Sequence, residues 1–455
     1  MMVILQSTLG FTLLVIVGVV ILGILVLVHE LGHFSAAKSC GIRVLAFSIG
    51  FGRPLLKKTI GGTEYRLSAV PFGGYVSMAG EHPEEKPVKE PGDFTAKPIW
   101  QRAIVAVAGP VANYLFAMVC LYLVFLLGIK TPVYMLRPVV GDVADSSSAQ
   151  KAGFLPGDSI VAINGKKVSN WEDIQRILSL QEQRNQIVFA RGSETKSLVL
   201  PLARVKTSRF PKEPTGGLLP GLPPVIGKVM DATPALAAGF RAGDTVASVN
   251  GGAVRSWDQL TSRVVHFDSA GGPLTFTIRR GGSPVLITAV PRFNKVDKRY
   301  QMGIMAAQPA KIKVRYGPVQ SIGKMLGKSW EYTTMIYDVL TKLFSKQVSP
   351  KQLAGPIGIV QMTGLVALGG PVEVMNLMAL IGINLAVLNL LPLIITDGGL
   401  LFFLLIEAVR RKPLSVKSQL LINRVAITFF ILLFAYVTYN DMVRLPELFK
   451  IMTGR

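Results

Sequence analysis

A short histidine-containing motif near the start of the chain is the segment best suited to chemistry. It reads His29-Glu30-Leu31-Gly32-His33, an HExxH pattern, in a sequence of 455 residues with only four histidines. If a helix continues through the motif, both imidazoles lie on one face and can reach one zinc ion at about 2.0–2.1 Å. Glu30 stands beside them and can take a proton from an attacking water molecule. The motif therefore predicts a hydrolase with one Zn²⁺ and Glu30 as general base.

A catalytic zinc ion needs a third protein ligand, and Asp397 is the best candidate. It lies between the sequence NLLP at 389–392 and a Gly-Gly pair, at the end of an apolar segment. The HExxH motif also closes an uncharged apolar run, and ionisable groups at membrane depth are costly and usually retained for function. Two plainer interpretations stay open: an interfacial histidine pair with an ordinary glutamate, and a helix-terminal turn residue at Asp397.

The elements that position these residues are predicted to be membrane spans. Apolar residues make up 50% of the chain and charged residues 17%, a balance that indicates a membrane protein. The first three of four apolar segments have roughly the 20 residues that a bilayer requires, and the fourth is shorter. These segments run over about residues 9–28, 104–127, 374–395 and 425–437.

The distribution of basic residues predicts the orientation of the spans, and the sequence around these residues argues against nucleic acid as a partner. Ten Lys and Arg residues lie between the first two spans, and a second basic loop joins the last two. Both loops are therefore expected in the cytoplasm, and the segment 130–372 and both termini outside. The net charge of +22 comes without a nucleic-acid motif, so we expect an anionic lipid surface and no nucleic acid as partner. The two cysteines do not indicate a disulfide framework.

The external segment contains an internal repeat with an offset of 86 residues. Each copy predicts a helix start, a turn, a strand (159–163 or 245–249), an Asn-Gly turn and a second helix. The pattern resembles the PDZ domain, which binds an extended peptide by adding it to a sheet edge; no binding-loop residue is clear, so peptide binding stays open. The repeated sequences are Ala-Gly-Phe at 152–154 and 238–240, Gly-Asp at 157–158 and 243–244, and Asn-Gly at 164–165 and 250–251.

Two further elements flank the predicted spans. Residues 318–344 place apolar side chains at helical spacing, which predicts a helix on the membrane surface or, equally, one packed on protein. Residues 64–70 and 75–78 alternate or run apolar around Pro71-Phe72-Gly73-Gly74, which predicts a short β-hairpin near the first span.

Taken together in their order, these motifs resemble the site-2 protease family over nearly the whole chain. The resemblance rests on HELGH at 29–33, GPVAN at 109–113, the PDZ pair, and NLLPxxxxDGG at 389–399. It implies regulated intramembrane proteolysis, in which a single-pass membrane protein already trimmed outside is cut within its transmembrane helix. The implied substrate is an anti-sigma factor or a signal-peptide remnant. The implied location is the inner membrane of a Gram-negative bacterium, with the PDZ pair and both termini in the periplasm and the pair acting as a size filter.

The resemblance also implies roles for individual residues. It makes His29, His33 and Asp397 the metal ligands and Glu30 the base. It links Asn384 and Asn389 to substrate handling, although helix–helix hydrogen bonding is an open alternative. Gly73 and Gly74 match a membrane-dipping β-loop that presents substrate as a strand. The sequence departs from the family pattern at Ile394, Thr396 and Leu400, where Pro, Leu and His are usual, so a supporting role of that histidine is in doubt.

The predicted fold is a polytopic α-helical membrane protein with four transmembrane helices, a small membrane-associated β-hairpin region and two tandem periplasmic PDZ domains. An alternative function is that of a non-catalytic PDZ scaffold. Such a protein would be expected to lack Glu30 or one of the metal ligands, and this sequence has all of them. A membrane-anchored protease for soluble substrates would be expected to carry HExxH away from an apolar span. The predicted domains are 1–132 (spans one and two with the β-loop), 133–210 and 218–308 (PDZ), 309–372 (surface helix and linker) and 373–455 (spans three and four).

Overall fold

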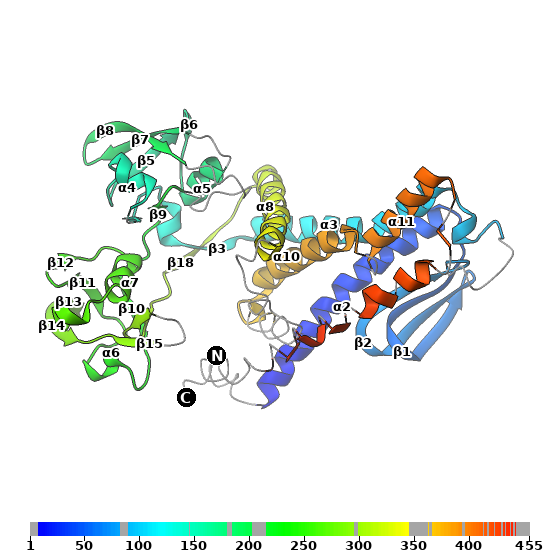
Figure 1. Cartoon of the computed structure of the whole chain (residues 1–455), viewed down its shortest axis with the longest axis horizontal. Coiled ribbons are helices and arrows are strands. Elements are labelled where there is room, and N and C mark those ends of the chain that lie inside the picture. Colours follow the sequence, from blue (N-terminus) through cyan, green and yellow to red (C-terminus); the bar gives the residue numbers. More distant parts are fainter. Residues whose placement is uncertain are drawn as a thin grey trace. The chain divides into compact units, whose positions relative to one another are not determined.

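The chain forms two compact units (Figure 1). The helical unit comprises Met1–Ile129 and Arg315–Thr453, and the repeat unit comprises Lys130–Val314 with the last two residues. The structure is a computed structural model. It describes residues 8–81, 90–144, 146–179, 184–202, 215–294, 299–344, 363, 366–393 and 396–412, with scattered residues between 414 and 442.

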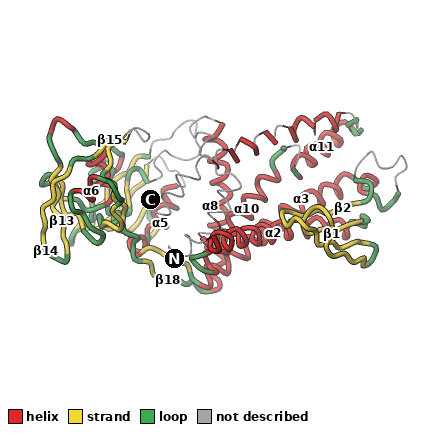
Figure 2. Tube along the Cα trace, turned by 90° about the horizontal axis from the view of Figure 1, so that it is seen from below, coloured by secondary structure: helices red, strands yellow, loops and turns green. Residues whose placement is uncertain are grey.

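Three long apolar helices lie side by side in the helical unit (Figures 1 and 2). They are α2 (Thr8–Ser39), α3 (Ile99–Leu127) and α10 (Pro371–Leu390). Among the described residues these are the three helices with an apolar stretch long enough to cross a bilayer. The first two predicted spans are thereby confirmed as helices. Their shared core includes the fully buried side chains of Leu25, Leu121 and Ile383.

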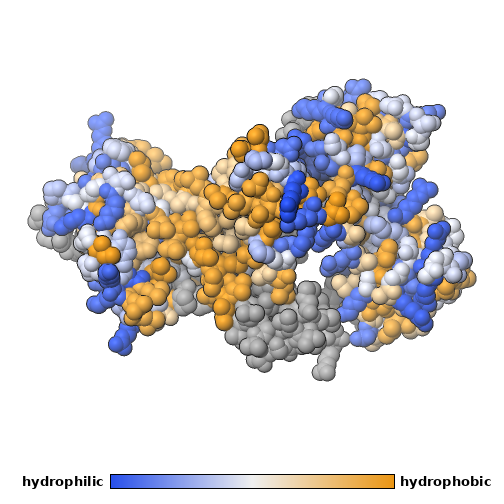
Figure 3. Space-filling view, turned by 180° about the vertical axis from the view of Figure 1, so that it is seen from behind, coloured by the Kyte–Doolittle hydropathy of each residue, from blue (hydrophilic) through white to orange (hydrophobic). Residues whose placement is uncertain are grey.

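The outer surface of these helices is also apolar. On α3 the exposed apolar side chains Val111, Leu115 and Val119 follow one another at helical spacing, and Figure 3 shows apolar residues gathered over the helical unit. A helix that is apolar on its inner and outer faces is typical of a membrane span, because lipid and protein core solvate it equally well.

The third span ends earlier than predicted, and Asp397 belongs to a different helix. Helix α10 stops at Leu390 instead of continuing to residue 395, and Asp397 begins the next helix, α11 (Asp397–Arg410). The cause is Pro392: the residue before a proline avoids helical backbone, and Leu391 has φ −65° and ψ 146°. The predicted fourth span, 425–437, lies partly outside the described residues.

The segment between α2 and α3 forms a sheet whose register differs from the predicted hairpin. Strands β1 (Val44–Ile60) and β2 (Thr63–Met78) pair around Gly61-Gly62, whose φ angles of 56° and 77° suit a tight hairpin turn. The hairpin prediction required residues 64–67 and 74–78 of β2 to pair with each other, and they do not. Both pair with residues 44–49 of β1, from opposite sides. The segment 74–78 is consequently an edge of the sheet.

The repeat unit consists of two similar α/β modules, in agreement with the repeat in the sequence. The first has a sheet in the order β6-β5-β7-β8, and the second has the order β12-β11-β13-β14. The predicted strands are confirmed as β5 (Ser159–Ile163) and β11 (Thr245–Val249), each followed by the Asn-Gly turn and a helix. The module elements are α4 (Ser148–Ala152), β6 (Lys166–Lys167), α5 (Trp171–Ser179), β7 (Arg184–Arg191) and β8 (Glu194–Pro201), then α6 (Pro234–Ala237), β12 (Gly252–Ala253), α7 (Trp257–Val265), β13 (Leu274–Arg280) and β14 (Ser283–Ala289).

Short strands complete each module in the same way. Strand β4 (Asp142–Val143) pairs with β9 (Leu218–Leu219), and β10 (Ile226–Val229) pairs with β17 (Ile304–Ala306). The modules therefore share their topology as well as their motifs. The remaining elements are η1 (Phe94–Ala96), β3 (Ile129–Pro132), η2 (Val133–Leu136), η3 (Ser269–Gly271), β15 (Arg292–Asn294), β16 (Arg299–Gln301), β18 (Lys311–Val314) and α8 (Pro318–Phe344).

Helix α8 spans the residues predicted for it. One face packs on protein: Tyr332 and Ile336 are buried in the core shared with α3 and α10. The other face carries exposed apolar side chains, among them Val319 and Trp330. Packing on protein therefore accounts for only one of the two apolar faces.

Candidate metal centre

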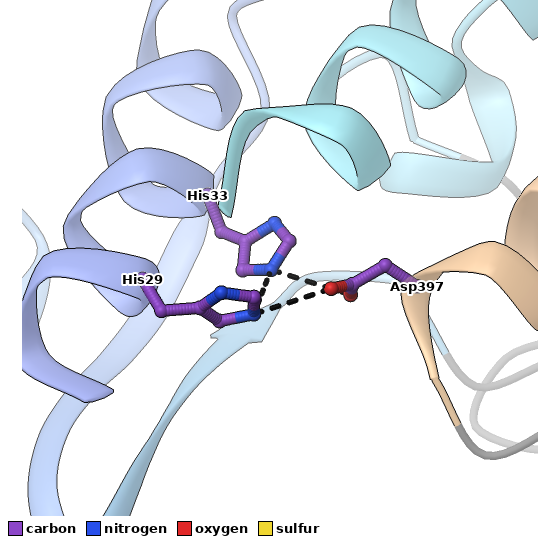
Figure 4. Close-up of side chains that lie close together, drawn as sticks. All are labelled: His29, His33 and Asp397. Carbon is purple, nitrogen blue, oxygen red and sulfur yellow. Dashed lines mark hydrogen bonds and ion pairs between the residues drawn. The ribbon is translucent and has the colours of Figure 1, made fainter. Parts of the chain in front are cut away.

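The two histidines of HExxH face the same point, because α2 runs without a break through the motif. Their Nε2 atoms are 3.1 Å apart. The side chains come from consecutive turns of α2 and point toward α11, as Figure 4 shows. Both residues are 9% exposed, so the pair lies inside the helical unit.

Asp397 closes the cluster from the first turn of α11. Its Oδ2 atom lies 3.2 Å from Nε2 of His29, and its Oδ1 atom lies 3.3 Å from Nε2 of His33 (Figure 4). The three groups offer ligand atoms within 4.8 Å of one another, the one such group of three or more among the described residues. Two imidazoles and a carboxylate are a donor set that zinc favours, and they leave a fourth position open.

Helix α3 supports His33 through its backbone. The Nδ1 atom of His33 lies 2.7 Å from the carbonyl oxygen of Val105. A carbonyl can only accept a hydrogen bond, so Nδ1 carries the proton, and in the neutral ring Nε2 keeps its lone pair toward the cluster. Gly109 makes this approach possible, because a Cβ atom there would overlap the His33 ring.

The catalytic-base candidate lies between the cluster and the sheet edge. The backbone of Val76 in β2 hydrogen-bonds the Glu30 carboxylate. A Cβ atom on Gly74 would come 3.4 Å from Cγ of Glu30, so the absence of a side chain at Gly74 leaves room beside the base. Gly73 has φ 100° and lies against the Phe51 ring, one residue farther from Glu30.

The two asparagines of α10 differ in their surroundings. Asn389 reaches the cluster, with Nδ2 3.5 Å from Nε2 of His29. Asn384 makes no such contact with the histidines, and its buried Oδ1 has no hydrogen-bond partner among the described residues. The structure thus brings one of the predicted pair to the candidate metal site and leaves the other with an unpaired oxygen.

The sequence reasoning did not single out Asn113 or Val105 as site residues. Asn113 is 1% exposed, and its Nδ2 lies 3.3 Å from Nδ1 of His29. The signal for Asn113 was present, since it closes the GPVAN segment. Val105 acts through its carbonyl oxygen, which every residue possesses, so its side chain carried no signal.

Two departures from the family pattern lie within the described residues. Thr396 Oγ1 donates to the carbonyl oxygens of Leu391 and Leu393, at 3.1 and 2.8 Å, and so bridges the break before α11. Leu400 packs against the apolar cluster that holds Val105 and Phe47. An apolar side chain at 400 is therefore accommodated by packing. Ile394 lies outside the described residues.

Comparison with known proteins gives the family. The model of peptidase family M50 matches residues 17–433. The chain is 34% identical to "Protease RseP" of Yersinia pestis over 446 residues, and 33% identical to "Regulator of sigma-E protease RseP" of Escherichia coli strain K12 over 446 residues. It is 34% identical over 442 residues to a Pasteurella multocida protein that carries a zinc metalloprotease name. Each alignment covers 94% of this chain and 98% of the relative. The chain therefore belongs to peptidase family M50 and is a membrane-type zinc metalloprotease.

Proposed function

We propose that this protease binds zinc through His29, His33 and Asp397 and cuts a peptide bond within the transmembrane segment of a single-pass membrane protein. The observation that carries the proposal is the convergence of the three ligand groups at the end of an apolar helix. A similar protein is named as a regulator of sigma-E protease, which supports an anti-sigma factor as substrate, after an earlier cut outside the membrane. A signal-peptide remnant is the alternative substrate.

The hydrogen-bond partners of the histidines are compatible with the tautomers that zinc requires. His33 already presents the Nε2 lone pair, because Val105 holds its Nδ1 proton. For His29 the same result needs an acceptor at Nδ1. Rotating the Asn113 amide would bring its Oδ1, which has no partner among the described residues, to that position. One rotation would thus give Asn113 a hydrogen bond and His29 the ligand tautomer.

Glu30 is the proposed general base. Its carboxylate lies at the sheet edge beside the ligands, held by the backbone of Val76. Bound zinc would supply Lewis acidity, which polarises a carbonyl group and lowers the pKa of a water molecule to about 7. Glu30 would take the proton of the attacking water and pass it to the leaving amine.

The edge of the sheet is the proposed substrate platform. Segment 74–78 is paired on one side only among the described residues, and Gly74 lies against the base. A substrate helix must unwind before attack, and each unpaired backbone group in lipid then costs several kcal/mol. Adding the unwound segment to this edge would satisfy those groups. Asn389, beside His29, and the unpaired oxygen of Asn384 are the proposed side-chain contacts.

We assign the two modules of the repeat unit to PDZ domains in the periplasm. The predicted bounds were 133–210 and 218–308, but Leu218–Leu219 (β9) pairs with β4 and lies in the core of the first module, so we place the boundary between the domains after Leu219. The duplicated topology and Asn-Gly turns support this fold. The basic loops of the helical unit support an inner-membrane orientation with both termini and this unit outside. In this arrangement the domains exclude substrates with an intact ectodomain. Four transmembrane helices, with the fourth near 425–437, complete the proposed topology.

The proposal is tested with full-length protein in detergent and a single-pass substrate that lacks its ectodomain. Glu30→Gln should lower turnover by at least about 100-fold, because general-base catalysis supplies about that much, while zinc content stays at the wild-type level. Glu64→Gln is the control: it removes the carboxylate that pairs with Arg66 on β2 at 2.8 Å. Turnover of Glu30→Gln close to that of the control would refute the assignment of the base.

A further inference from the structure

We propose that Arg102 and Glu407 are positioning residues for the metal site. Their ion pair fastens α11 to α3 and thereby fixes where the α11 carboxylate Asp397 stands relative to the histidines. The inference rests on the proposed function, because it assumes that Asp397 is a zinc ligand. It assigns Glu407, an acid near the cluster in sequence, a role other than metal binding.

The pair has the geometry of a strong, oriented contact. Nη2 of Arg102 donates to Oε1 of Glu407 at 2.6 Å, and Nη1 donates to Oε2 at 3.0 Å. Such two-pronged pairs fix orientation as well as distance. The side chains are only 11% and 18% exposed, and Nε of Arg102 donates to the carbonyl oxygen of Lys97 at 3.0 Å. The guanidinium is therefore anchored to Lys97, just before α3, on one side and to α11 on the other.

One face of α11 links the pair to the metal site. Asp397, Leu400, Leu404 and Glu407 follow at intervals of three, four and three residues, so they lie on the same side of the helix. Leu404 is 3% exposed and Leu400 packs against a buried apolar cluster. The two acids are about 15 Å apart along the axis at 1.5 Å per residue. The helix is thus fastened near its C-terminal end, while its N-terminal end carries the ligand.

One face of helix α3 carries both Arg102, which binds α11, and the groups that contact His33. Arg102, Val105 and Gly109 are spaced by three and four residues. The carbonyl of Val105 binds Nδ1 of His33, and Gly109 lies against the His33 ring. One helix face therefore sets the place of a histidine directly and the place of Asp397 through the ion pair. A shift of α11 along α3 would change the separation of the ligand groups.

Positional specificity explains this pair better than stability does. A buried ion pair often adds little net stability compared with apolar side chains of similar volume, because two charges must leave water. Its angular requirement is much stricter than that of an apolar contact. Helix α11 is separate from α10, which ends at Leu390, and its N-cap residue Thr396 is held near that end by hydrogen bonds to Leu391 and Leu393. The oriented contact of Glu407 at the far end of α11 adds a second attachment and so fixes the direction of the helix.

The test measures zinc affinity in the purified full-length protein by competition with a chelator, beside thermal unfolding. Glu407→Gln keeps the size of the side chain and removes its charge. It should weaken zinc binding by about tenfold, the lower end of what supporting contacts contribute at metal sites. The exchange Arg102→Glu with Glu407→Arg should restore most of the loss, whereas Arg102→Glu alone should be worse than Glu407→Gln.

The matched control is Asp93→Asn, which breaks the pair of Asp93 with Arg43 at 2.7 Å in the same unit. It should lower the unfolding temperature without changing zinc affinity. If Glu407→Gln behaves like this control, or if the exchanged pair restores nothing, the positioning role is wrong. Asp397→Asn separates the two proposals: retained zinc there refutes the ligand assignment, whereas lost zinc there with wild-type affinity in Glu407→Gln refutes only the positioning role.

Discussion

At the residue scale, zinc binding is expected to depend most on Asp397, the proposed third ligand, because two histidines alone bind zinc weakly. Asp397→Asn keeps the shape but removes the charge, so zinc occupancy and turnover should both fall, by more than the tenfold to hundredfold typical of supporting residues. Asp397→Ala should lose zinc more completely. Metal content per purified chain, measured beside activity, checks both variants. Full zinc occupancy in Asp397→Ala would show that another residue completes the site.

The sequence located the side chains that meet at the candidate metal site, but not the backbone groups that contact them. His29 and His33 could be predicted because two residues four apart on a helix lie next to each other on the same face. Asp397 could be predicted from its Gly-Gly neighbours and its depth. The partners of His33 and Glu30 are a carbonyl oxygen of Val105 and the backbone of Val76. Which backbone groups contact His33 and Glu30 depends on how α3 and β2 are aligned with α2. Residue types alone do not show this alignment, because the segments are far apart in the sequence.

At the element scale, the close crossing of α2 and α3 decides whether the site can form. Gly109→Leu should push α3 away from the His33 ring, since even a Cβ atom overlaps that ring. Zinc affinity should fall together with the unfolding temperature. Gly23→Ala in α2 is the matched control, because a Cβ atom there meets nothing within 4 Å; both quantities should stay near wild type. Wild-type zinc affinity in Gly109→Leu would contradict this account of the crossing.

The elements themselves were predictable to the extent that their signals were local. Asn164-Gly165 and Asn250-Gly251 fixed two tight turns, with φ angles of 49° and 74°, and 49° and 76°. Pro392 could have predicted the end of α10 at Leu390, but the continuing apolar run concealed it. The order of segments in the β1–β2 sheet could not be predicted, because residues 44–49 accept a partner on both sides and the alternation of side chains is the same for either pairing.

At the scale of the whole molecule, the same ion pair occurs in both modules of the repeat unit, and it predicts how their stability depends on pH. Asp244 binds Arg280, as Asp158 binds Arg191. Burial alone would raise the pKa of Asp244, but the hydrogen bonds from Arg280 and from the backbone of Arg241 lower it below its ordinary value. A depressed pKa contributes stability that is present above the unfolded value of about 3.9 and is lost as pH falls through the lower folded value.

We therefore expect the second module to lose stability below about pH 4. Asp244→Asn should lower its stability at neutral pH and flatten this acid dependence. Proteolysis of the full-length protein across the pH range, followed at cleavage sites in residues 218–308, measures both effects. The same acid dependence in the variant as in wild type would assign it to other carboxylates.

The strands at the boundary of the repeat unit allow the filter role to be tested by excision. Strands β3 and β18 pair with each other, and the backbone N–H of Val133 donates to the carbonyl oxygen of Ala310 at 2.9 Å. The entry and exit of the unit are therefore adjacent, as is common where a domain is inserted in another. Replacing residues 134–309 with a short Asn-Gly turn should close this pair into a hairpin and leave the chain of the helical unit intact.

The excised protein should bind zinc with wild-type affinity, because every proposed ligand lies in the helical unit. It should cut a truncated substrate at a rate within a few-fold of wild type and should also cut a substrate that keeps its folded ectodomain, which wild type should leave intact. A Glu30→Gln version of the excised protein should cut neither. If the excised protein binds zinc but still rejects the intact substrate, exclusion resides in the helical unit. If it binds zinc but cuts neither substrate, the repeat unit delivers substrate rather than filtering it.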